Sequence, residues 1–202
     1  MAQNYPPGFT YADFAASLKY DLFNATQWAE LFVKSGAKYT VFLTKHHDGF
    51  TLWPSATSFN WNSQDVGPRR DVTGEITAAT KAAGLHAGVY HSLFEWVNPL
   101  FLADQANNFT TRNFVKKTMG ELHDLVSRYE PDVIWSDGDW PAGTAQCDSF
   151  IAKYCSKVKR TSLSRHCSRS SWDPQDTRCL LLAQDGVLKD LPPLHVKLQQ
   201  KA

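Results

Sequence analysis

The chain has 202 residues, 43% of them hydrophobic, and a formal net charge of +1. This length allows one domain with a substantial core, and the near-zero charge gives no reason to expect nucleic acid or a membrane surface as a partner. No apolar run approaches the roughly 20 residues of a transmembrane helix. Residues 1–8 lack the apolar centre of a signal peptide.

Charge and composition change sharply near residue 143. Residues 1–142 carry 11 Lys/Arg and 15 Asp/Glu, whereas residues 143–202 carry 10 Lys/Arg and 5 Asp/Glu together with all four cysteines. The cysteines lack Cys-x-x-Cys spacing, so we do not expect a zinc site there. We expect residues 1–142 to form the structured unit and residues 143–202 a divergent, poorly ordered tail.

Helix-like and strand-like segments alternate along the first part of the chain. Trp28, Leu31 and Phe32 are spaced to share one face of a helix that Gly36 is well placed to end. Strand-like segments are rich in β-branched, aromatic and aliphatic residues. The other expected elements are helices at 71–83 and 114–129 and strands at 38–44, 85–91 and 132–136.

This alternation predicts parallel strands joined by helical crossovers. Each predicted strand ends in polar or aromatic residues, namely 45–48, 90–91 and 137–139. Parallel strands bring those ends to the same edge of the sheet, which is where barrels of this kind carry their chemistry. We therefore expect the three groups of side chains to converge.

Asp137 lies where the third predicted strand stops and a loop begins. It is followed by Gly138 and Asp139, and Asp-Gly is a common turn dipeptide, so a purely structural role is the simplest alternative. A carboxylate at this place could also be a nucleophile, a general base or a metal ligand. Asp139 and Glu95 are the nearest candidates to support it, and Tyr90 could donate a hydrogen bond to it or to a substrate.

His46 and His47 are adjacent at the end of the first predicted strand. Neighbouring strand residues point to opposite faces, so two histidines at one site require a loop conformation. They could ligate a metal if further His, Asp or Glu residues approached, or bind sugar hydroxyls as neutral rings, or simply lie in a loop. Aromatic side chains that could wall such a site are Trp53, Phe94, Trp96 and Trp140.

Two N-glycosylation sequons, at Asn24 and Asn108, favour a secretory route.

Three blocks of sequence together resemble a known family, the α-L-fucosidases of glycoside hydrolase family 29, and most closely its animal lysosomal or secreted branch. The similarity covers about residues 4–142. The blocks, in the family's order, are Lys45-His46-His47-Asp48-Gly49-Phe50, Gly88-Val89-Tyr90-His91-Ser92-Leu93-Phe94-Glu95-Trp96 and Trp135-Ser136-Asp137-Gly138-Asp139-Trp140.

The resemblance implies a (β/α)8-like barrel that hydrolyses terminal α-L-fucose with retention, without metal or cofactor. It matches Asp137 to the nucleophile, His46 and His47 to histidines that bind fucose hydroxyls, and Tyr90 to a tyrosine near both. The family's first barrel strand and its Glu-Trp-Tyr block are not found, and neither is the block that carries the acid/base Glu. Retention needs both carboxylates, so we expect this chain to be incomplete and doubt its activity alone.

The sequence thus predicts an α/β fold, part of a (β/α)8 TIM-like barrel with about three parallel strands. The predicted site comprises Asp137 as nucleophile, His46, His47, Tyr90 and Trp53 for substrate binding, and Asp139 and Glu95 in support. Fucosylated glycans are the expected partners, and the expected location of a full-length member is lysosomal or secreted. Two alternatives stay open: a metal-dependent hydrolase using His46, His47, Asp48 and Asp137, and a non-catalytic sugar-binding protein.

Overall fold

The computed structural model describes residues 4–108, 110–111, 113–137 and 180–182. A four-stranded sheet lies at its centre, in the order β1 (Tyr39–Lys45), β2 (His86–Ser92), β3 (Val133–Asp137) and β4 (Leu180–Leu182). β1, β2 and β3 are parallel, whereas β4 pairs antiparallel with β3. The three predicted parallel strands are therefore confirmed, each displaced by one residue toward the C-terminus.

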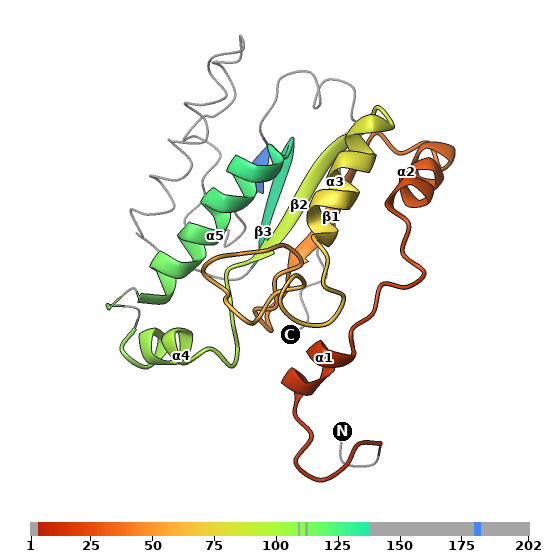
Figure 1. Cartoon of the computed structure of the whole chain (residues 1–202). Coiled ribbons are helices and arrows are strands. Elements are labelled where there is room, and N and C mark those ends of the chain that lie inside the picture. Colours follow the sequence, from red (N-terminus) through yellow and green to blue (C-terminus); the bar gives the residue numbers. More distant parts are fainter. Residues whose placement is uncertain (1–3, 109, 112, 138–179, 183–202) are drawn as a thin grey trace, which may run out of the picture.

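Helices connect the parallel strands and cover one face of the sheet. Figure 1 shows α3 (Val72–Ala82) and α5 (Asn113–Tyr129) lying in front of the strands, with α2 (Ala25–Lys34) beside α3 and α4 (Pro99–Ala106) near the start of α5. Two short turns, η1 (Tyr11–Asp13) and α1 (Phe14–Ser17), precede them. Residues 46–71 form a long loop at the carboxyl ends of the strands (Figure 1). None of the described helices is long and apolar enough to cross a membrane.

The core lies between the sheet and the two covering helices. From the sheet, Val89 and Ile134 are fully buried. From the helices, Val72, Ile76 and Leu125 are at most 2% exposed. Each such side chain contributes roughly 1.5–3 kcal/mol by leaving water. This packing therefore holds β2 and β3, together with the site residues at their ends, against α3 and α5.

The helices begin where the sequence offers capping groups. The side chains of Asn24, Asp71 and Asn98 each accept a hydrogen bond from a backbone N–H in the first turn of α2, α3 and α4. Helix α4 was not predicted from the sequence, although Pro99 at its first turn is a favourable start signal. Its eight residues show little contrast between faces, so the periodicity there is weak.

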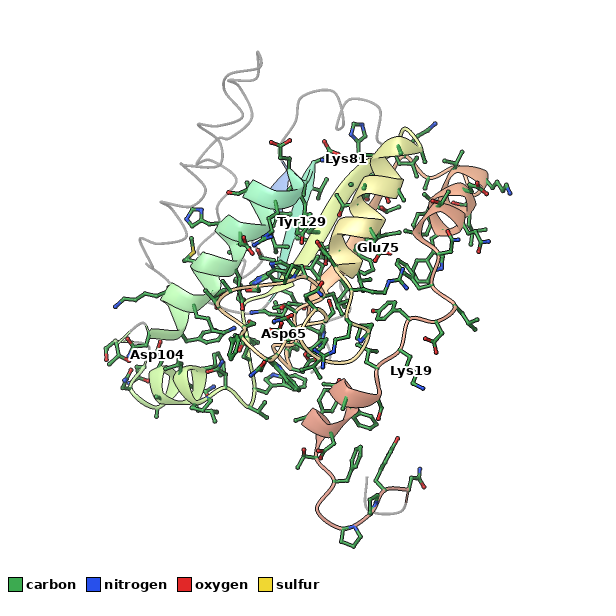
Figure 2. The ribbon with its side chains drawn as sticks, viewed as in Figure 1. Lys19, Asp65, Glu75, Lys81, Asp104 and Tyr129 are labelled. Atoms are coloured by element: carbon green, nitrogen blue, oxygen red, sulfur yellow. The ribbon has the colours of Figure 1, made fainter. Side chains whose placement is uncertain are left out.

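Long-range polar contacts hold the helices to one another and to the loops. The Tyr129 hydroxyl, which lies between α5 and α3 (Figure 2), donates to the Asp71 carboxylate at 3.0 Å from Oδ1 and 2.9 Å from Oδ2. Asp104, on α4, accepts the Phe114 N–H at 2.8 Å in the first turn of α5. Burial, with Asp71 in addition, raises the pKa of Tyr129 well above its usual range. These contacts hold α5 against α3 and α4, the helices on the covered side of the sheet.

The prediction of a poorly ordered tail at 143–202 falls outside the described residues, apart from β4.

Candidate functional site

His46 and His47 lie side by side in the loop that follows β1. Their ring centroids are 4.1 Å apart, and His46 also stacks on Tyr90 at 5.9 Å with an interplanar angle of 15°. β1 ends at Lys45, directly before the pair, so the histidines are freed from the alternation of a strand. This is the loop conformation that two adjacent histidines at one site require.

Asp137 ends β3 beside this pair. Tyr90 Oη donates to Asp137 Oδ2 at 2.5 Å, and His47 Nε2 lies 3.9 Å from the same oxygen. The backbone of Asp137 is held as well, because its carbonyl accepts the Leu93 N–H at 2.7 Å. Burial and the neighbouring Asp137 carboxylate raise the pKa of Tyr90, so this phenol stays protonated and remains a donor at neutral pH.

The protonation of His47 follows from its surroundings. Burial, and then the adjacent His46, lower the pKa of His47, although Asp137 acts in the opposite direction. Its Nδ1 is 2.6 Å from Ser92 Oγ, which leaves Nε2 facing Asp137. A neutral imidazole can donate through one nitrogen and accept through the other, which suits it to bind a hydroxyl group beside the carboxylate.

Trp135 and Ser92 also belong to the site, although neither was predicted from the sequence as a site residue. Trp135 is 42% exposed and its ring lies 6.4 Å from Tyr90, while Ser92 orients His47. A signal was available, since Trp135 stands two residues before Asp137 and Ser92 two residues after Tyr90. In a strand, residues two apart share a face. Trp96, at 61% exposure, completes the aromatic border at 4.9 Å from the His47 ring.

Two predicted site residues lie elsewhere, and their predicted roles are corrected. Trp53 is fully buried, and its Nε1–H donates to Asp124 on α5 at 3.0 Å, so the ring packs in the core and cannot contact a substrate there. Glu95 is 2% exposed and its carboxylate bonds to Lys45, Lys117 and Asn98. It therefore cannot support Asp137 directly.

Asp139 and Trp140, also predicted near the site, fall outside the described residues.

A metal ion fits the cluster only loosely. One ligand atom each from His46, His47 and Asp137 can be chosen so that all lie within 4.8 Å of one another. Ligand atoms about 2.0–2.2 Å from a tetrahedral zinc stand roughly 3.5 Å apart, whereas His47 Nε2 and Asp137 Oδ2 are 3.9 Å apart. Asp48, which the metal hypothesis would add, instead caps its own loop by accepting the Phe50 N–H at 2.7 Å. The arrangement is better suited to hydroxyl groups beside a carboxylate.

Comparison with known proteins gives one consistent result. A family model described as Alpha-L-fucosidase matches residues 1–179. The tissue alpha-L-fucosidase of Mus musculus is 58% identical over 155 residues, which are 75% of this chain and 34% of that protein. The plasma alpha-L-fucosidase of Homo sapiens is 52% identical over 141 residues, which are 69% and 30% of the two chains. This chain thus spans about a third of the length of these relatives.

Solved structures agree with the sequence comparison. The alpha-fucosidase of Thermotoga maritima in complex with fucose superposes with a TM-score of 0.68 and 33% identity, over 77% of this chain and 38% of that chain. An alpha-L-fucosidase of Bacteroides thetaiotaomicron superposes with a TM-score of 0.62 and 27% identity, over 74% and 34% of the two chains. The α/β arrangement described above is therefore that of a part of their catalytic domains.

Proposed function

Because the chain belongs to the alpha-L-fucosidase family, we propose that it carries the nucleophile half of a site for retaining hydrolysis of terminal α-L-fucose. The observation that carries the proposal is the convergence of Asp137, Tyr90, His46 and His47 at the carboxyl ends of three parallel strands. The solved Thermotoga maritima relative, bound to fucose, adds support for the substrate class.

In this mechanism Asp137 attacks the anomeric carbon of fucose. A C–O bond forms to the carboxylate while the bond to the leaving alcohol breaks, and water later hydrolyses the fucosyl-aspartate. Tyr90 holds the Asp137 carboxylate in place through the 2.5 Å hydrogen bond. His46 and neutral His47 bind the sugar hydroxyls, and Trp135 and Trp96 border the ring. The acid that protonates the leaving group has to lie roughly 5–5.5 Å from the nucleophile, and none of the described residues fills that role.

We further propose that residues 1–142 are part of a (β/α)8 barrel. The sheet face that carries Leu43, Tyr90 and Trp135 in one row opposes the helix-covered face. Leu43 and Trp135 are 44% and 42% exposed there, which is unusual for residues on a central sheet. In a closed barrel this face becomes the packed interior. We propose fucosylated glycans as partners and a lysosomal or secreted location, in line with relatives named tissue and plasma enzymes.

The experiment compares two proteins on an aryl α-L-fucoside. One is the 202-residue chain, and the other is a chimera in which its matching residues replace those of the mouse tissue enzyme. In the chimera, Asp137→Gly should abolish turnover, and azide should restore part of it by occupying the space of the side chain. Asp139→Ala should be milder, and Asp21→Gly, at an exposed carboxylate far along the chain from the site, serves as the matched control.

A fucosyl fluoride that traps the covalent intermediate should label Asp137 in a peptide map. Label on Asp139 or Glu95 would overturn the assignment of the nucleophile. The chimera should also be indifferent to a chelator, and loss of activity on chelation would favour metal-dependent hydrolysis instead. Fucose binding by the 202-residue chain without turnover would indicate a sugar-binding protein.

A further inference from the structure

A cluster of buried charges begins at the residue before the histidine pair and lies on the helix-covered side of the sheet, where it includes two side chains of α5. We call it the buried ion cluster; it consists of Lys45, Glu95, Lys117, Glu121 and His91. Lys45 Nζ lies 2.6 Å from Glu121 Oε2 and 2.9 Å from Glu95 Oε1, and neither Lys45 nor Glu121 is exposed at all. Lys117 Nζ bridges the same two carboxylates at 2.5 Å each.

The charges of this cluster balance. Burial, with Lys45 nearby, lowers the pKa of His91 to about 4, so His91 is neutral at physiological pH while its Nε2 lies 3.0 Å from Glu121 Oε2. Burial opposes ionisation of Glu121, but Lys45, His91 and Lys117 outweigh it and hold the pKa of Glu121 well below its usual range. Two lysines therefore face two carboxylates, and the cluster is neutral overall.

The position of Lys45 in the chain links this cluster to the site. The pairing of β1 with β2 shifts between Leu43 and Lys45, so that Thr44 is an extra residue and Lys45 pairs with His91. Thr44 Oγ1 donates to the Tyr90 carbonyl at 2.6 Å and holds this bulge. Bulges redirect the side chains that follow them. Here the bulge places the Lys45 side chain on the helix-covered face of the sheet, and the strand ends directly before His46.

Glu95 fixes the same loop from the other strand. A Cβ placed on Gly49 would lie 2.7 Å from the Glu95 carboxyl carbon, so the loop after the histidines passes closely over this side chain. The Trp96 N–H donates to the His47 carbonyl at 2.9 Å, which joins the two loops directly. The His46-His47 loop is therefore anchored at Lys45, before it, and at Glu95, beneath it.

Stability alone does not account for such a cluster. Taking charges out of water is costly, and apolar residues of similar volume often stabilise a core as well or better. Charged hydrogen bonds, unlike apolar contacts, impose fixed directions on the groups they join. A directional network that starts at the residue before His46 and passes close to Gly49 is therefore better explained by the orientation it imposes on this loop.

We propose that Lys45 is a positioning residue, which acts through Glu95 and Glu121 to hold His46 and His47 facing Asp137. Lys45 is fully buried and does not contact substrate. The consequence for fucose binding rests on the proposed function, whereas the orientation of the two histidines does not.

The test uses three variants of the 202-residue chain, each also built into the chimera. They are Lys45→Met, the charge-balanced Lys45→Met/Glu121→Gln, and Glu95→Gln. Lys81→Met is the matched control, since Lys81 is exposed and its Nζ bonds to the carbonyls of Tyr129 and Glu130 at the far end of α3. Circular dichroism reports the fold, and imidazole NMR signals with their pH titrations report His46 and His47.

We expect the charge-balanced variant to retain the fold while the His46 and His47 signals move and the titration of His47 changes. In the chimera, kcat/KM should fall by about a hundredfold, as expected for a misplacement near 1 Å, with a raised KM because the histidines bind the sugar before and during reaction. Lys81→Met should leave all of these measurements unchanged.

Unchanged histidine signals in a folded Lys45 variant would overturn the proposal. Unfolding of all three variants would also overturn it, because the cluster would then serve global stability. If the signals move but the parent chimera shows no fucosidase activity, the positioning role stands and the proposed function fails.

Discussion

His91 should make the stability of this protein fall as the pH is lowered below about 6.5. It is fully buried on β2, and its Nδ1 has no hydrogen-bond partner among the described residues. Protonation would bury an unpaired N–H and a positive charge beside Lys45. Burial, and then Lys45, lower the pKa of His91 to about 4 in the folded state, against about 6.5 in the unfolded chain.

The sign and size follow from proton linkage. Between pH 6.5 and 4 the unfolded chain binds the proton and the folded chain does not, so acid favours unfolding; above pH 6.5 the effect vanishes. A difference of about 2.5 pKa units corresponds at most to roughly 3.4 kcal/mol, of which about 2 kcal/mol is lost by pH 5. His47, whose pKa is also lowered, acts in the same direction.

Urea unfolding followed by Trp fluorescence at pH 8, 6.5 and 5 would measure this loss. His91→Gln keeps an N–H donor for Glu121 but cannot titrate, so its free energy of unfolding should fall by about 2 kcal/mol less than that of the parent between pH 8 and 5. His86→Gln, on the same strand but with a 42% exposed side chain, should alter the pH dependence of the free energy of unfolding less than His91→Gln does. If the free energy of unfolding depended equally on pH in the parent and in His91→Gln, the inference that His91 is neutral in the folded state would be refuted.

Three further substitutions test the packing and the site. Gly49→Ala should destabilise the fold by more than about 1 kcal/mol, because φ is +78° and the new Cβ would meet Glu95; a urea midpoint equal to that of the parent would show that the loop can move aside. Leu125→Ala, at a fully buried position of α5, should cost about 2–5 kcal/mol in the same assay, and a cost below 1 kcal/mol would contradict its place in the core. Tyr90→Phe in the chimera removes the hydrogen bond to Asp137, which at about 1.5–3 kcal/mol predicts a roughly 10- to 150-fold loss of kcat/KM. Unchanged kinetics would exclude Tyr90 from the reaction.

The strands and most helices could be predicted because their signals are local. Aliphatic and β-branched runs around Val41, Val89 and Ile134 are compatible with strands whatever packs on them, and the alternation with helices implied the parallel order. The convergence of Asp137 with His46 and Tyr90 followed from that order alone. The helix α4 lacked such a signal, because its eight residues show no clear apolar stripe.

The direction of individual side chains near the strand ends could not be predicted. Glu95 stands in the same motif as Tyr90, and Trp53 follows the histidine motif closely, yet both are buried and bond to side chains of α5. Once a strand gives way to a loop, the period of two no longer applies, and chain proximity ceases to indicate the face. The direction of the Trp135 side chain, in contrast, could have been predicted, because Trp135 lies within β3 two residues before Asp137 and therefore shares its face.

The sequence by itself determined the elements, their parallel order and the set of residues gathered at one edge of the sheet, because these depend on residue types and spacing along the chain. Only the tertiary structure decided which of those residues face the site and which lie behind it. That choice depends on the bulge at Thr44 and on the two carboxylates that meet Lys45, one from the loop after β2 and one from α5. Those partners are 50 and 76 residues away in sequence, and no pattern local to Lys45 reveals them.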